Sequence, residues 1–292
     1  MSRSGGFWAG VVFGGAALGA VIATAYFVST NEPVTHDDLC FVTDAEGETY
    51  ARTSEAANNA ALVAAVGHRR GLSTYASTIG VATAIQESGL RNLDYGDRDS
   101  LGLFQQRPSQ GWGTIEEVTD PHYASLAFYW RLKKTDGWED MRVTDAAQAV
   151  QRSGFPEAYQ DHADEGAAWA EAIRGDTPFA AVDCDLAAVT EPNTAAALAE
   201  RISKDFGDDA YTVAVLAKND KATLLGIQAT SGEPKELDGL ANWGVAVAAE
   251  QSIASVRLGD TQWLREQGVS PNTGIDEFDG VLIGVVTSVP TD

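Results

Sequence analysis

The pattern of hydrophobic and polar positions divides this chain into three parts. Residues 7–28 are an apolar run without a charged side chain. Residues 40–184 repeat apolar positions at helical spacing, whereas residues 193–292 also contain short runs that are typical of strands. We therefore predict an α+β protein, in which one N-terminal helix precedes a mainly α-helical domain and then a small α+β domain with an antiparallel sheet.

Five helices are predicted in the middle part from residues that favour helix ends. Ser, Thr and Asp cap the start of a helix, and Gly follows its end. Residues 92–101 form the one long non-helical insert. The helices begin at Thr53 or Ser54, Ser73 or Thr74, Asp120-Pro121, Thr144 and Glu157, and the markers of their ends are Gly71, Gly89, Lys134, Pro156 and Gly175.

Residues 185–192 are predicted to be a linker, and residues 193–292 to be the second domain. Asn193 or Thr194 can cap its first helix. Asn219-Asp220 is the turn of a predicted hairpin. The predicted elements are a helix ending near Phe206, strands over 211–217 and 221–229, a helix over 237–251, and strands over 253–258 and 281–288.

The N-terminal apolar run predicts a membrane anchor, since a helix of about 20 apolar residues spans a bilayer. Arg3 precedes the run, and Asp37 and Asp38 follow it, so we expect the N-terminus to stay in the cytoplasm. The alternative is a secreted protein, because Ala23-Thr24-Ala25 has the form of a signal-peptide cleavage site. The expected order is a cytoplasmic tail at 1–6, a single-pass transmembrane signal anchor at 7–28, a linker at 29–39, and both domains outside the cell membrane.

Charge and composition exclude some classes of function. The chain has 292 residues, with 42 acidic and 20 basic side chains and a net charge of −22. Nucleic acid is excluded as a partner because a phosphate backbone requires a basic surface. The four histidines show no metal-ligand spacing, and no phosphate-binding glycine loop is present, so we expect neither a metal site nor a cofactor.

The two cysteines, Cys40 and Cys184, bracket the helical domain. Outside the membrane an even number of cysteines favours a disulfide bond. We expect their Cα atoms to lie within about 7 Å of each other, because a wider gap cannot be bridged without backbone movement. The alternative is two buried free thiols.

The strongest candidate for chemistry lies in residues 84–114. Glu87 comes at the end of a predicted helix, just before Gly89. The negative end of the helix dipole and an apolar wall both disfavour a charged carboxylate, so they raise its pKa. A carboxyl that keeps its proton near neutral pH can act as a general acid in the cleavage of a glycosidic bond. We expect this carboxyl to open into a groove shared with Gln105, and we expect Trp112, between two glycines, to be partly exposed.

Two motifs in this stretch resemble the signature of lysozyme-like lytic transglycosylases and goose-type lysozymes. Glu87-Ser88 precedes Gly102-Leu103-Phe104-Gln105, in the order of the family's glutamate–serine and glycine–leucine–methionine–glutamine motifs. A third motif, an aromatic residue followed by asparagine on a later helix, has Val150-Gln151 as its counterpart here. The resemblance covers residues 40–184. This part of the chain looks like the lysozyme-like domain that is found in secreted actinobacterial proteins.

The resemblance implies that Glu87 is the catalytic acid and base in the cleavage of peptidoglycan glycan strands between N-acetylmuramic acid and N-acetylglucosamine. A lytic transglycosylase needs no second carboxylate, whereas a hydrolase would use Asp97 or Asp99 to hold water. The alternative is a catalytically inactive glycan-binding scaffold, because Val150-Gln151 departs from the family motif. The residues expected to contact the glycan are Ser88, Gln105, Gln106, Trp112 and Gln151.

The second domain, residues 193–292, contains no catalytic constellation in its sequence. We expect it to bind the cell wall or a cell-envelope protein partner.

Overall fold

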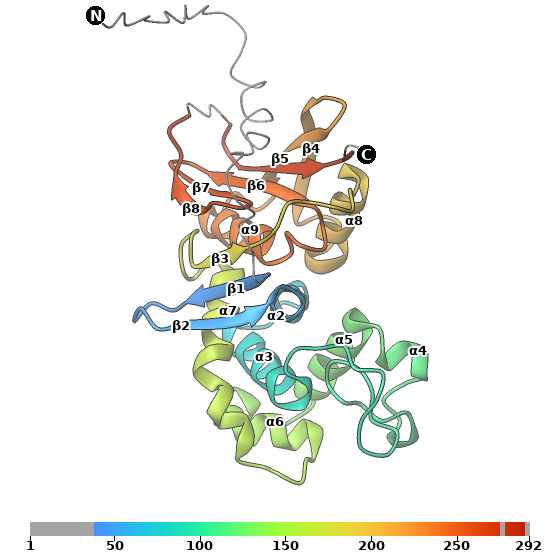
Figure 1. Ribbon diagram of the computed structural model, residues 1–292. Coiled ribbons are helices and arrows are strands. Elements are labelled where there is room, and N and C mark those ends of the chain that lie inside the picture. Colours follow the sequence, from blue (N-terminus) through green and yellow to red (C-terminus); the bar gives the residue numbers. More distant parts are fainter. Residues whose placement is uncertain (1–37, 275–277, 290–292) are drawn as a thin grey trace, which may run out of the picture.

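The computed structural model describes residues 38–274 and 278–289. Within these ranges the protein is α+β, with eight α-helices and two antiparallel sheets. In Figure 1 the larger sheet lies in the upper part, most of the helices lie in the lower part, and the smaller sheet lies between them. The predicted anchor at 7–28 lies outside the described residues, and no helix inside them is both long and apolar enough to cross a bilayer.

The smaller sheet joins the two ends of the helical half. Its order is β2 (Thr49–Thr53), β1 (Leu39–Thr43) and β3 (Val182–Asp185), and both pairings are antiparallel. Cys40 lies directly opposite Cys184 with the two Cα atoms 4.0 Å apart, and their sulfurs form a disulfide bond. The predicted disulfide is therefore confirmed, and the alternative of free thiols is wrong.

The first two helices begin and end where their capping residues predict. α2 (Ser54–Arg69) begins after Thr53, whose side chain accepts a hydrogen bond from a backbone N–H of the first turn. α3 (Thr74–Ser88) begins after Ser73 and ends at Gly89, which adopts a left-handed conformation with φ of 64°. Glycine adopts this conformation without the steric cost of a Cβ atom, so the helix stops directly after the Glu-Ser motif.

The next two long helices follow the prediction in part. Asp120 caps α5 (Pro121–Leu132), as expected. α6 (Val143–Gln151) begins before Thr144, which was expected to cap it. The Thr144 hydroxyl instead donates a hydrogen bond to the carbonyl of Pro156, so it ties the start of α6 to the segment that follows the helix.

The single helix predicted from residue 157 to residue 174 is two elements. A 3₁₀ turn, η3 (Ala158–His162), precedes α7 (Ala163–Arg174), which ends at Gly175 as predicted. The remaining short elements are η1 (Pro108–Gln110), α4 (Ile115–Val118) and η2 (Trp138–Asp140).

The second half is built on an antiparallel sheet of six strands. The predicted hairpin is confirmed, and the side-chain oxygen of Asn219 closes its turn by accepting hydrogen bonds from the backbone N–H groups of Lys221 and Ala222. α8 (Ala195–Phe206), capped by Thr194, and α9 (Pro234–Ala246) are the helices of this half. The strand order is β4 (Tyr211–Lys218), β5 (Ala222–Ala229), β9 (Val281–Val286), β6 (Ile253–Leu258), β7 (Thr261–Leu264) and β8 (Gly268–Pro271).

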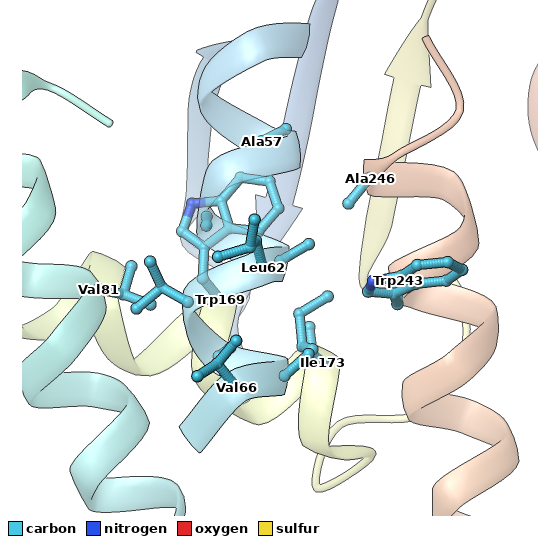
Figure 2. Packing of buried hydrophobic residues seen from close by; sticks show 14 of the residues in the cluster. Ala57, Leu62, Val66, Val81, Trp169, Ile173, Trp243 and Ala246 are labelled. Carbon is cyan, nitrogen blue, oxygen red and sulfur yellow. The ribbon is translucent and has the colours of Figure 1, made fainter. Parts of the chain in front are cut away.

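One large hydrophobic cluster spans both halves of the molecule. Figure 2 shows Leu62 of α2 and Ile173 of α7 gathered with Trp243 and Ala246 of α9, and all four belong to this cluster. The predicted linker has no helix or strand after β3, but its Leu186 is fully buried. The helical half therefore packs closely against the sheet half through α2, α7 and α9.

A buried carboxylate also links the two halves. Asp205 of α8 is fully buried, and its Oδ1 lies 2.5 Å from Nε2 of His122 on α5. Nε of Arg201 donates to both carboxylate oxygens at 2.9 Å, and the indole of Trp243 donates to Oδ2 at 2.8 Å. A buried charge is costly unless it is paired and hydrogen-bonded, so this cluster fixes how α5, α8 and α9 lie relative to one another.

Candidate functional site

Glu87 opens into a groove beside the last turn of α3. The groove has a volume of about 630 Å³, and Gln105 lines it together with Glu87, as the sequence predicts. The end of α6 and the residues that follow it form another part of the wall, through Gln151 and Phe155. Side chains from three separate segments of the helical half therefore surround one carboxyl.

The surroundings of Glu87 favour its protonated form. Burial raises the pKa of the carboxyl above its ordinary value, while hydrogen bonding by Tyr159 and Gln151 lowers that pKa and partly opposes the shift. The Tyr159 hydroxyl donates to Oε1 of Glu87 at 2.6 Å. A carboxyl held in this way can give up a proton to a substrate and still be stabilised as a carboxylate afterwards.

Two hydrogen bonds bring the sequence motifs together. The Ser88 hydroxyl donates to the carbonyl of Leu103 at 2.7 Å, so the end of α3 is tied to the Gly102–Gln105 motif. Nε2 of Gln151 donates to the carbonyl of Phe104 at 2.8 Å, which ties the same motif to the end of α6. Ser88 is buried and does not line the groove, so its role in this structure is to position the motif.

Gln105 and Gln106 point in different directions. Gln105 has a left-handed backbone with φ of 46°, and it lines the groove. Gln106 is buried, and its Nε2 donates to the carbonyl of Ala124 at 3.0 Å. Gln106 therefore does not line the groove, because its amide is inside the core.

The side chain of Trp112 is less exposed than its glycine neighbours predict. It lines the groove, but its side chain is only 8% exposed, so the expectation of a partly exposed ring is wrong. The Arg131 guanidinium carbon lies 3.6 Å from the centre of the ring and covers one face. Phe155, which is 74% exposed, is the more exposed of the two aromatic side chains that line the groove.

Asp97 and Asp99, the two candidates for a second carboxylate, differ in their contacts and in their exposure. Asp99 pairs with Arg107 at 2.8 Å and also accepts hydrogen bonds from Ser109. These contacts hold the pKa of Asp99 well below its usual range, so it acts as a loop-forming anion. Asp97 lines the groove, but its side chain is 90% exposed.

Several residues at the groove were not expected from the sequence. Tyr159 on η3 is the aromatic residue beside Glu87, whereas Val150, the counterpart in the family motif, is buried in the core. The sequence offered one signal for Tyr159. It is an aromatic residue that follows shortly after Pro156, the proline that interrupts the predicted helix. Four arginines also line the groove, namely Arg98, Arg107, Arg131 and Arg152.

The side chains at the groove are suited to proton transfer. Over the ranges that the structure describes, no group of three His, Cys, Asp or Glu side chains lies close enough to hold a metal ion. The available chemistry is the Glu87 carboxyl with its tyrosine partner, the carboxylate of Asp97, three amides and four guanidinium groups. The comparisons with known proteins add nothing to this geometry, since no family model and no curated protein matches the chain.

Proposed function

We propose that this chain is a membrane-anchored, extracytoplasmic enzyme that cleaves peptidoglycan glycan strands as a lytic transglycosylase. The observation that carries the proposal is the carboxyl of Glu87, which has a raised pKa and opens into a groove. A glycosidic oxygen leaves readily only if it is protonated as the carbon–oxygen bond breaks. A carboxyl that holds its proton near neutral pH supplies that proton.

One carboxyl serves two successive steps in this reaction. Glu87 first donates its proton to the oxygen that bridges C1 of N-acetylmuramic acid and the next sugar, and the bond from C1 to that oxygen breaks. The carboxylate then accepts the proton of the C6 hydroxyl of the same muramic acid, and the C6 oxygen bonds to C1. The products are a 1,6-anhydro end and a free hydroxyl on the released sugar, and Glu87 is protonated again. The hydrogen bond from Tyr159 stabilises the carboxylate between the two steps.

The state of the other carboxylates favours transglycosylation over hydrolysis. A hydrolase that inverts configuration needs a second carboxylate to hold a water molecule on the opposite face of the sugar. Asp99 is committed to Arg107 and Ser109, and Asp97 is almost fully exposed. Neither has the buried, fixed position that would aim water at C1.

Mass spectrometry of the digestion products tests the proposal. Full-length protein is incubated with purified cell-wall glycan, and we expect soluble muropeptides that end in 1,6-anhydro-N-acetylmuramic acid. Products heavier by one water molecule would overturn the transglycosylase assignment. In that case Asp97→Asn would identify a hydrolase if it abolished product release.

The second candidate function is a glycan-binding scaffold without turnover. The observation that favours it is the burial of Val150 where the family motif has an aromatic residue. The same digestion assay separates the two functions. Glycan that sediments with the protein and releases no soluble product would support the scaffold.

The second half is proposed to contact the wall or a cell-envelope protein. The proposed membrane location rests on the apolar run at residues 7–28. Membrane fractionation followed by protease treatment of intact cells tests the location. Full-length protein in the soluble fraction would overturn it.

A further inference from the structure

The groove around Glu87 has a charge opposite to that of the whole chain. The protein carries 42 acidic and 20 basic residues. At the groove, four arginines face two carboxyl groups, those of Glu87 and Asp97. A concentration of one sign of charge in a cleft attracts ligands of the other sign.

Two of these arginines form ion pairs with acidic neighbours. Arg107 is paired with Asp99 at 2.8 Å. Arg98 lies 3.9 Å from Asp97, and both side chains are largely exposed, so this pair is weak. Arg98 and Arg107 therefore contribute little uncompensated charge.

The other two arginines have no acidic partner among the described residues. Within residues 38–274 and 278–289, neither Arg131 nor Arg152 makes an ion pair with a carboxylate. Arg131 lies over Trp112, and its Nη2 donates to the carbonyl of Gly111 at 2.9 Å, which fixes its position. Arg131 and Arg152 line the same groove. Burial lowers the pKa of Arg131, and the positive charge of Arg152 lowers it further.

The backbone holds Arg152 at the wall of the groove. Arg152 follows Gln151 directly and ends α6 in a left-handed conformation with φ of 56°. Glycine adopts that conformation more easily than arginine, so this position carries a side chain at a conformational cost. The turn is fixed by Gln148, whose side chain exchanges hydrogen bonds of 3.0 and 3.1 Å with the backbone of Ser153.

We propose that Arg152 and Arg131 bind a carboxylate carried by the glycan, so that the groove selects negatively charged strands over neutral ones. The inference rests on the proposed function for its substrate. A carboxylate between the two guanidinium groups relieves their repulsion and accepts charge-assisted hydrogen bonds from both. On a peptidoglycan strand this carboxylate belongs either to the lactyl group of muramic acid or to the stem peptide.

Matched substrates test the inference with the full-length protein. Peptide-free glycan strands with free lactyl carboxylates are compared with the same strands after conversion of those carboxylates to methylamides. We expect kcat/KM to be at least about tenfold higher for the charged strands, because loss of a hydrogen bond to a charged group has a cost of that size. We also expect added salt to reduce this preference. A preference that appears only with strands bearing stem peptides assigns the carboxylate to the peptide.

Variants of Arg152 identify the group that selects. We expect Arg152→Gln to bring the ratio of kcat/KM for charged and amidated strands close to one, and Arg152→Lys to restore part of the preference. Arg142→Gln is the control, because Arg142 lies at the other end of α6, pairs with Asp145 and Glu157, and does not line the groove. A ratio that is unchanged in Arg152→Gln would overturn the inference.

A binding measurement keeps this inference separate from the proposed function. Calorimetry with Glu87→Gln compares the affinities for charged and amidated strands in the absence of turnover. If the wild type digests neither strand but Glu87→Gln binds the charged one at least about tenfold more tightly, the proposed function fails and the inference stands. Equal affinity for both strands refutes the inference even if the wild type digests them.

Discussion

The hydroxyl of Tyr159 donates a hydrogen bond of 2.6 Å to Oε1 of Glu87, although 72 residues separate the two in the chain. The contact joins η3 to the last turn of α3 and fixes the direction of the carboxyl. It also favours the charged form of Glu87, against the effect of burial. The position and the acidity of the proposed catalytic acid therefore depend in part on a side chain outside the sequence motifs.

Tyr159→Phe should change the pH dependence of activity. Loss of the hydroxyl removes a contact that lowers the pKa of Glu87, so that pKa should rise further. The fall in kcat/KM at high pH, where the acid loses its proton, should move to higher pH. We also expect kcat to fall by about tenfold because the carboxyl is less well oriented.

Tyr211→Phe is the control, because its hydroxyl donates to the carbonyl of Glu236, far from the groove in the fold. If Tyr159→Phe and Tyr211→Phe have the same pH profile as the wild type, Tyr159 does not tune the acid.

Glu87→Gln should abolish digestion and preserve the fold. The substitution keeps the shape of the side chain, so we expect the free energy of unfolding to change by no more than about 1 kcal/mol. Glutamine has no proton to donate to the leaving oxygen, and loss of a general acid costs about a hundredfold or more in rate. Muropeptide release measures the rate, with the exposed Glu200→Gln as the matched control. Digestion by Glu87→Gln at the wild-type rate would show that another group is the acid.

The stability difference between wild type and Glu87→Gln should depend on pH. The folded protein raises the pKa of Glu87, so it binds this proton more tightly than the unfolded chain does. The contribution of Glu87 to stability is therefore fully present below its unfolded pKa of about 4.3 and is lost as pH rises through the folded pKa. The neutral glutamine has no such loss, so Glu87→Gln should gain Tm relative to wild type between acidic and neutral pH. A difference in Tm that stays constant over this range would contradict the raised pKa.

Removing the disulfide should destabilise the protein strongly. The bond between Cys40 and Cys184 closes a loop with a sequence separation of 144 residues. The chain-entropy model gives a loop of that size about 5 kcal/mol as an upper value. Cys40→Ala combined with Cys184→Ala should lower the midpoint of denaturant unfolding to that of the reduced wild type. A reductant should then change the unfolding of the wild type and leave that of the double variant unchanged.

Helices with clear local signals were predicted well. The cap at Ser73 and the left-handed Gly89 act within one or two turns of the helix that they delimit, so sequence alone contains the necessary information. β1 and β3 were not predicted, because each has only four or five residues and they pair across more than a hundred intervening positions. β7 and β8 were also not predicted, because they are only four residues each, although they pair with each other across a short turn.

The candidate site was predicted where its residues are close in sequence. Glu87 and Gln105 belong to motifs in one stretch, and both line the groove. The exposure of Trp112 could not be read from its glycine neighbours, because Arg131, which covers the ring, lies on α5. The pairing of Tyr159 with Glu87 likewise depends on where η3 packs, which no local pattern specifies.

The disulfide also determines how the protein responds to mechanical force. Cys40 lies near the beginning of the described chain and Cys184 at the end of the helical half, and a single bond joins them. Tension applied between Asp38 and the end of β9 would pass from β1 through the two sulfurs to β3. Residues 41–183, which carry Glu87 and the whole groove, lie outside this covalent path. A pull on the ends of the described chain would therefore stretch the sheet half and leave the helices around Glu87 without load.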